Sequence, residues 1–274
     1  MKITQKNRPF KNVMRQRKIK DLDKKIAQFS ALIADEPDKN RGIWRKVFNA
    51  EPGSKIFAEV GSGKGRFIIK TAINNPENYY IGIEGQESVF YRALQKACAG
   101  PEVSKFDLAE LALKSGPDKA PKNLRFVLDY VTGPEFFFAP GELDGIFLNF
   151  CDPWPKARQE KRRLTSPEKL KIFSDALAPG SSIRFKTDNE ALFRYSLEKM
   201  KETDSLKLWA CEEDLHGSSY GEKNIETEYE LKFVNLLRKI YYIEVRKDYE
   251  RRKNESIITE RKPERKGQYV DSPE

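Results

Sequence analysis

The chain has 274 residues, of which 34% are charged and 38% hydrophobic, and its formal net charge is +9. No apolar run reaches the roughly 18 residues that a membrane-spanning helix needs, and the basic start lacks the apolar segment of a secretory signal. Three cysteines without C-x-x-C spacing and a single histidine argue against a disulfide framework, a metal site and a Ser-His-Asp or Cys-His centre. We therefore expect a cytoplasmic protein and rank a transit peptide lower.

The positive charge is concentrated in two short segments. Residues 1–25 carry ten Lys or Arg against two Asp, and residues 153–163 carry five against one Glu. Because such segments on a near-neutral body attract polyanions, nucleic acid is the first partner that we expect. For residues 1–25 alone, a solvated tail is an equal alternative.

The predicted elements alternate between helices and strands. After a basic stretch with one helix near residues 22–32, short apolar strands are predicted at 56–60, 79–83, 124–128, 145–150 and 182–186. Helices are predicted between them at 66–74, 87–97, within 100–122, and from Ser166-Pro167 to Pro179-Gly180. A helix to Met200 then precedes two late strands, 206–211 and 240–245, which flank a helix at 227–237.

This alternation predicts an α/β fold with a mainly parallel sheet and helices on both faces. We divide the chain into a basic N-terminal extension (1–45), one α/β domain (46–247) and a charged C-terminal tail (248–274). Ligands of such sheets bind outside the carboxyl ends of the strands, so the residues that directly follow the strands are the candidates for a site.

A glycine-rich turn follows the first long strand. Gly61, Gly63 and Gly65 precede a helix. The lack of a Cβ lets the backbone adopt positive φ and pass close to a ligand, and the helix N-terminus favours the anionic end of that ligand. The spacing is not the dinucleotide fingerprint G-x-G-x-x-G, because Arg66 stands at its last position, and this disfavours NAD(P). A tight turn without a ligand is the alternative that the glycines alone leave open.

Two carboxylates strengthen the prediction of a cofactor site. Glu84 ends the second strand, where it could accept hydrogen bonds from both hydroxyls of a ribose, and Asp129 ends the third, within reach of an adenine amino group. Either one alone is more often a solvated residue. The ordered set after successive strands resembles the Rossmann-like fold of S-adenosylmethionine-dependent methyltransferases.

A narrower resemblance lies downstream. Asn149-Phe150-Cys151-Asp152-Pro153-Trp154-Pro155-Lys156, followed by Lys161-Arg162-Arg163-Leu164, is similar to the signature of the tRNA (guanine-N7)-methyltransferase family. Residues 60–67, 185–189 and 227–230 match further blocks of that family in order, so the resemblance covers roughly residues 55–245. Cys151 and Tyr130 depart from the family pattern.

The resemblance implies a role for each matching position. The cofactor, S-adenosylmethionine, would be bound by Glu59, Gly61, Gly63, Gly65, Glu84, Asp129 and Asp152, with Asp152 the catalytic residue. The substrate, a guanosine in the variable loop of tRNA, would be contacted by Lys156, Asp188, Thr227, Glu228, Tyr229 and Glu230. The RNA would be bound by Arg158, Lys161, Arg162 and Arg163. We expect activity without a metal or a second subunit, and the oligomeric state stays open.

The chemistry needs little from the protein beyond positioning and charge. The N7 atom of guanine carries a lone pair and no proton, so no base is required, and Asp152 is expected to act as a clamp and electrostatic stabiliser. Structural alternatives remain for three residues. Asp188 could be a helix N-cap, and Thr227 with Glu230 could form a capping box.

Three other functions compete with this one. Asp152-Pro153-Trp154-Pro155 is also similar to the motif of amino-methylating enzymes, which favours methylation of adenine in DNA or rRNA as a second enzyme hypothesis. A non-catalytic RNA-binding protein on the same fold is the third, although the intact glycine turn and carboxylates argue against it. A dehydrogenase is the fourth and ranks last.

Overall fold

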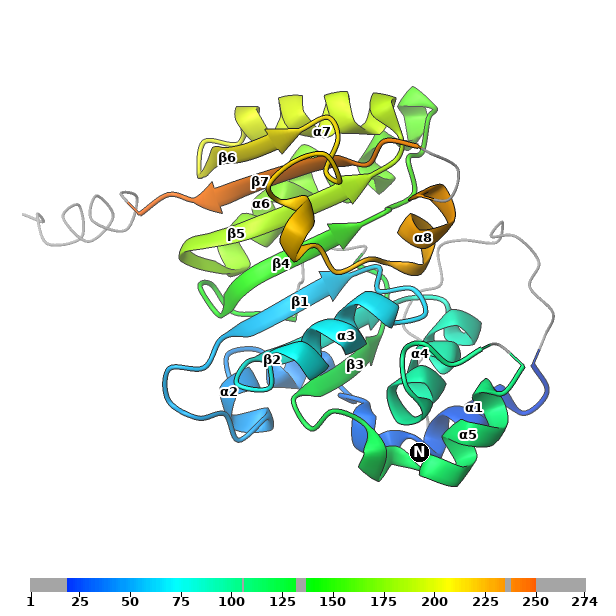
Figure 1. Ribbon diagram of the computed structural model, residues 1–274. Coiled ribbons are helices and arrows are strands. Elements are labelled where there is room, and N and C mark those ends of the chain that lie inside the picture. The colour runs from blue at the N-terminus through cyan, green and yellow to red at the C-terminus, as the bar shows by residue number, and fades with distance from the viewer. Residues whose placement is uncertain (1–18, 105, 132–136, 235–237, 250–274) are drawn as a thin grey trace, which may run out of the picture.

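A seven-stranded sheet forms the centre of the computed structural model, which describes residues 19–104, 106–131, 137–234 and 238–249 (Figure 1). The strand order is β3-β2-β1-β4-β5-β7-β6. The bounds are β1 Ile56–Val60, β2 Tyr79–Glu84, β3 Leu124–Leu128, β4 Leu143–Asn149, β5 Leu177–Thr187, β6 Leu206–Glu212 and β7 Tyr241–Lys247. Strands β1 to β5 pair in parallel, and β7 runs antiparallel to β5 and β6, which confirms the predicted mainly parallel sheet.

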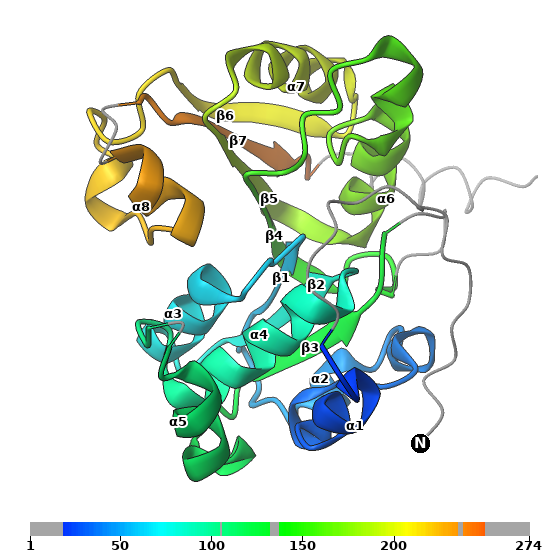
Figure 2. The ribbon, with the colours of Figure 1, turned by 90° about the vertical axis from the view of Figure 1, so that its right-hand side faces the viewer.

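Helices cover both faces of the sheet (Figure 2). The helices of one face are α3 (Arg66–Asn74), α4 (Glu87–Ala99) and α5 (Leu108–Ser115), and those of the other are α6 (Pro167–Ala176) and α7 (Glu190–Glu202). The described chain also contains α1 (Leu22–Ala27), α2 (Trp44–Val47), α8 (Glu228–Val234) and 3-10 turns at Ser30–Leu32, Pro37–Asn40, Pro117–Lys119, Ala157–Arg162 and Gly221–Lys223. Side chains of β1 point alternately to the two faces of the sheet, each of which has its own apolar cluster. Ile56 and Ala58 are buried in one cluster, and Phe57 packs against the other.

Two predicted boundaries around β5 and α7 are corrected. Helix α6 ends at Ala176 and β5 begins at once, so the prediction of a helix to Pro179-Gly180 and a strand from residue 182 was wrong there. The pairing with β4 shifts register between Leu143 and Gly145, and this irregularity accommodates a proline and a Gly180 with φ of 78° inside the strand. The cap of α7 is Asn189, whose side chain accepts the Leu192 N–H at 2.8 Å, and not Asp188.

The segment before β1 wraps around the edge of the sheet. Ile26 and Phe29 bury against the face that carries α3 and α4, and the Ala34 N–H donates to the Phe126 carbonyl of edge strand β3 at 2.9 Å. Trp44 then buries in the cluster of the opposite face. This covers an otherwise open strand edge. Residues 1–18 of the predicted extension and the tail from residue 250 lie outside the described residues, and the boundaries after residues 45 and 247 stay predictions.

We expect Trp44→Ala to lower the free energy of unfolding by about 3–5 kcal/mol. Trp44 is 0% exposed and its Nε1–H donates to the Phe137 carbonyl at 2.8 Å, so truncation leaves both a cavity and an unsatisfied acceptor. Urea unfolding measures the effect. Its neighbour Ile43 is 45% exposed, and Ile43→Ala should stay within about 0.5 kcal/mol of the wild type. Similar losses in the two variants would contradict the described packing.

Candidate functional site

The glycine turn between β1 and α3 has the backbone that was predicted for it. Gly61, Gly63 and Gly65 all have positive φ, at 78°, 57° and 80°. At Gly65 a Cβ would lie 3.1 Å from the Ala93 Cβ, so glycine also permits the close approach of α3 to α4. The turn at the carboxyl end of β1 therefore needs glycine for its own geometry.

Glu84 fastens this turn to the end of β2. Its Oε2 accepts the Gly63 N–H at 3.0 Å and its Oε1 accepts the Gln86 N–H at 2.7 Å. Burial raises the pKa of Glu84, and these backbone donors act in the opposite direction. A carboxylate has about four acceptor sites, so Glu84 keeps acceptor capacity for a hydroxyl of a ligand. Asp129 follows β3 at the surface, with β2 between it and β1.

A buried carboxylate lies beneath the turn. Glu59 is 2% exposed, its Oε1 accepts a hydrogen bond from Asn149 Nδ2 at 2.8 Å, and its Oε2 has no partner. The hydroxyl of Ser62 is also buried without a partner. Because buried polar atoms are nearly always satisfied, these two orphans beside the glycine turn indicate a polar ligand. The residues present thus fit a cofactor with amino and hydroxyl groups.

The loop after β4 carries Asp152, which is exposed. Asp152 lies near enough to Glu84 for its charge to raise the pKa of that carboxyl. Two bulky residues of the loop have a left-handed backbone, Phe150 with φ of 50° and Trp154 with φ of 40°. Such strain persists only where the surroundings enforce it, and it concentrates at functional sites.

The basic residues of this loop divide into two groups. Lys156, Arg158, Lys161 and Arg162 are exposed, and the Arg162 guanidinium lies 4.8 Å from the Trp154 ring centroid. Arg163 is only half-exposed and donates to backbone carbonyls of the loop itself. The first group is exposed to solvent, whereas Arg163 is engaged with the backbone of the loop.

The predicted capping box is confirmed. The Thr227 N–H donates to Glu230 Oε2 at 3.2 Å, and the Glu230 N–H donates to Thr227 Oγ1 at 3.0 Å. Glu230 is 0% exposed and its Oε2 also accepts from Lys186 Nζ at 2.9 Å. Lys186, near the end of β5, is thus buried in an ion pair.

The other predicted substrate residues differ in their ion pairs and in their exposure to solvent. Glu228 forms an ion pair with Lys96, and its Oε2 lies 3.6 Å from the Nζ of Lys64 in the glycine turn, so α8 contacts that turn. Asp188 lies 3.6 Å from Arg238. Tyr229 is 58% exposed, and its ring is stacked with that of Phe150 at a centroid distance of 6.3 Å. Of the four residues 227–230, Tyr229 is therefore the one that the structure leaves most accessible to a substrate.

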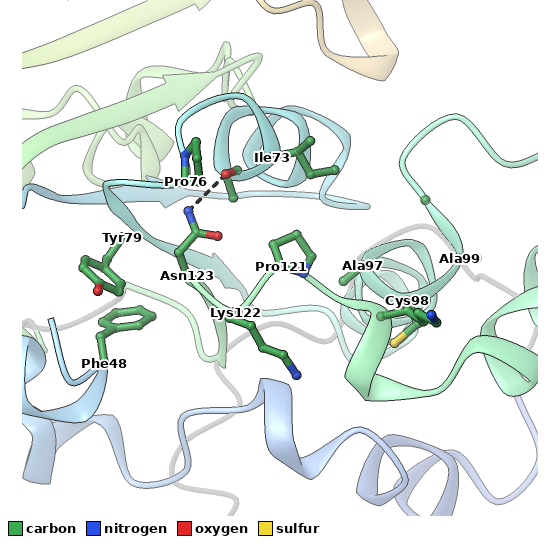
Figure 3. A pocket seen from close by; sticks show the side chains of 13 residues that line it. Phe48, Ile73, Pro76, Tyr79, Ala97, Cys98, Ala99, Pro121, Lys122 and Asn123 are labelled. Atoms are coloured by element: carbon green, nitrogen blue, oxygen red, sulfur yellow. Dashed lines mark hydrogen bonds between the residues drawn. The ribbon is translucent and has the colours of Figure 1, made fainter. Parts of the chain in front are cut away.

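Lys186, Asn149 and Ser62 lie in segments that the sequence marked as candidates, but none of the three was assigned a role in the site. Each lies at or directly after the carboxyl end of a strand, and this position was the available signal. The ≈650 Å³ cavity in Figure 3 lies elsewhere, where Asn123 and Tyr79 precede or begin strands at their amino ends. In the described ranges no metal-binding group of His, Cys, Asp or Glu occurs, and no helix is long and apolar enough to cross a membrane.

We expect Glu230→Gln to lower the free energy of unfolding by about 3–5 kcal/mol, because it leaves the buried Lys186 charge without its partner. Urea unfolding checks this, and Tyr229→Ala is the matched control, since it removes an exposed side chain of the same helix. An unchanged unfolding curve for Glu230→Gln, with loss of substrate binding, would show that the carboxylate serves the substrate instead.

Glu59→Gln should remove a pH dependence of stability. Burial raises the pKa of Glu59 from its ordinary 4.5 to about 8, so between these values the folded protein keeps a proton that the unfolded chain has released. Wild-type stability should fall as pH rises through that window, because the folded state binds more protons. In thermal unfolding without cofactor, the unfolding temperature of Glu59→Gln relative to that of the wild type should increase as the pH rises. Parallel pH curves would contradict this, and exposed Glu222→Gln is the control.

Comparisons with known proteins agree on a family. Residues 53–243 match a family model described as "Putative methyltransferase". A tRNA (guanine-N(7)-)-methyltransferase of Listeria monocytogenes serotype 4b (strain F2365) is 42% identical over 224 residues, which are 82% of this chain and 94% of that protein. The crystal structure of the 16S rRNA methyltransferase KamB matches with a TM-score of 0.50 at 14% identity, over 71% of this chain and 88% of that one, and shows the fold alone. The predicted Rossmann-like methyltransferase fold and the predicted family are thereby confirmed, and the chain belongs to the tRNA (guanine-N(7)-)-methyltransferase family.

Proposed function

We propose that this protein transfers the methyl group of S-adenosylmethionine to N7 of a guanosine in the variable loop of tRNA. The observation that carries the proposal is that the Asp152 loop, the glycine turn and Glu84 lie together at the carboxyl ends of the neighbouring strands β4, β1 and β2. The 42% identity to a tRNA (guanine-N(7)-)-methyltransferase supports the same substrate. We place the reaction in the cytoplasm, without a metal or an obligatory second subunit.

The cofactor would be bound by residues at the carboxyl ends of β1, β2 and β3. Bound there, S-adenosylmethionine supplies an electrophilic methyl group on its sulfonium. The backbone of Gly61 to Gly65 would take the polar methionine end at the start of α3, and the free lone pairs of Glu84 would take the ribose hydroxyls. Asp129 would contact the adenine, and Glu59 Oε2 would regain the partner that it lacks.

Asp152 would act on the base. Methylation at N7 leaves a positive charge on the guanine ring, and a carboxylate held next to the ring stabilises that charge as it develops. Asp152 has the exposure that this requires. Tyr229, which stacks on Phe150 at the start of the same loop, is 58% exposed and could contact the base. Alignment of N7 with the methyl group then supplies much of the rate.

The tRNA backbone would be bound by the exposed cations Lys156, Arg158, Lys161 and Arg162. Of these, Lys156 is only four residues from Asp152 and would also contact the guanosine. Phosphate contacts give affinity without reading sequence. Choice of one guanosine would then come from the shape of the tRNA and from a base that is accessible outside a helix.

The test uses purified protein, S-adenosylmethionine with a labelled methyl group, and an unmodified tRNA transcript. Borohydride followed by aniline cuts the RNA chain at 7-methylguanosine. Label incorporation with a single cut in the variable loop is the expected result. Incorporation without a cut would instead mean methylation of another atom, and the absence of cofactor binding would refute the enzyme hypothesis.

Asp152→Asn should lower the turnover number about 10²–10³-fold, because the amide keeps the shape but loses the charge that stabilises the methylated base. The labelled-methyl assay at saturating tRNA measures it. Asp118→Asn is the control, since Asp118 is fully exposed on the 3-10 turn Pro117–Lys119. Full turnover by Asp152→Asn with unchanged cofactor affinity would exclude the proposed role.

A further inference from the structure

Arg163 differs from the basic residues that precede it. Its Nε–H donates to the carbonyls of Pro153 at 3.1 Å and Trp154 at 3.3 Å, and its Nη2–H donates to the Trp154 carbonyl at 3.1 Å. The side chain is half-buried, whereas Arg158 and Lys161 are exposed. Its donors are thus directed at the backbone of the loop that carries Asp152.

The other side of the Arg163 guanidinium is held by α7. It lies 4.2 Å from the ring centroid of Tyr195, a distance typical of cation–π contact. The Tyr195 hydroxyl donates to Glu160 Oε1 at 2.9 Å, which connects this ring back to the basic turn. Partial burial, together with Glu160, raises the pKa of Tyr195 to about 12, so the hydroxyl keeps its proton near neutral pH. Arg163 is therefore fixed between a helix and the loop.

The loop needs such an external partner. Pro153 and Pro155 have no N–H groups, so the segment from Asp152 to Lys156 has few donors with which to stabilise itself. Trp154 is a bulky residue with φ of 40°, a conformation that its surroundings must enforce. Its carbonyl is the atom that receives two of the three Arg163 hydrogen bonds.

We propose that Arg163 is a positioning residue, which holds Asp152 in place through the backbone of Pro153 and Trp154 and does not bind RNA phosphate. The proposal rests on the proposed function for its kinetic consequence. It replaces the RNA-binding role that the sequence predicted for Arg163. A planar guanidinium can reach two carbonyls at once from fixed donors, and a lysine ammonium cannot reproduce that geometry.

The decisive comparison is Arg163→Lys with Arg158→Lys and Arg158→Ala in the full-length protein. Arg163→Lys keeps the charge but loses the planar guanidinium that donates to two carbonyls. Because a small misplacement of a catalytic group such as Asp152 can have that effect, kcat should fall by up to about 100-fold. KM for tRNA and the salt dependence of tRNA binding should stay as in the wild type. Arg158→Ala should instead raise KM for tRNA. It should also reduce the slope of log binding constant against log salt concentration by about 1.

Hydrogen exchange supplies a readout that needs no activity. The amides of Asp152, Trp154 and Lys156 should exchange faster in Arg163→Lys, and also in Tyr195→Leu, which removes the ring beneath the guanidinium. They should be unchanged in Arg158→Lys. Global thermal unfolding is measured in parallel, and a local change in exchange with an unchanged unfolding temperature is the expected result.

Two results would overturn the proposal: wild-type exchange and kcat in Arg163→Lys, or an Arg163→Ala variant that loses tRNA affinity and salt slope in the manner of Arg158→Ala. Failure of the proposed function is recognised separately, because the wild type would then give no 7-methylguanosine. In that case the exchange comparison alone decides, with faster loop exchange supporting the positioning role and unchanged exchange refuting it.

Discussion

The site depends on one buried lysine at the end of β5. The Nζ of Lys186 donates to Glu230 at 2.9 Å, to Asn224 at 2.9 Å and to the Ile225 carbonyl at 3.1 Å. Its own carbonyl accepts the Phe150 N–H at 2.8 Å, at the start of the Asp152 loop. One residue thus connects a strand of the sheet, the segment that leads into α8 and the loop that carries the proposed catalytic carboxylate.

Burial of this charge has consequences for its neighbours. Desolvation lowers the pKa of Lys186, and the negative charge of Glu230 opposes the shift because it stabilises the ammonium. The same lysine acts against the rise in the pKa of Glu59. A buried ion pair contributes little net stability compared with apolar residues but is costly to break, so its value here is to specify one arrangement of the segment over the site.

The fold was predictable from sequence where a pattern has one structural meaning. Gly61, Gly63 and Gly65 between an apolar strand and a helix predicted the turn and its positive φ, and Thr227 with Glu230 at N-cap spacing predicted the capping box. The start of β5 was not predictable, since Pro179-Gly180 normally ends an element and here lies within a register shift. Trp44 was also missed as core, because its burial arises from a segment that wraps the sheet edge, a tertiary contact without a local pattern.

The basic residues of the loop after β4 look alike in sequence but differ in exposure and backbone conformation. Arg158 and Lys161 are three residues apart on a 3-10 helix and so point to the same side, which is exposed. Arg163 follows the last helical residue with an extended backbone, φ −63° and ψ 134°, so its side chain is no longer aligned with theirs. Composition alone gives all these residues the same role, whereas the end of the helix at Arg162 separates cations that face solvent from Arg163, which donates to the backbone of the loop that carries Asp152.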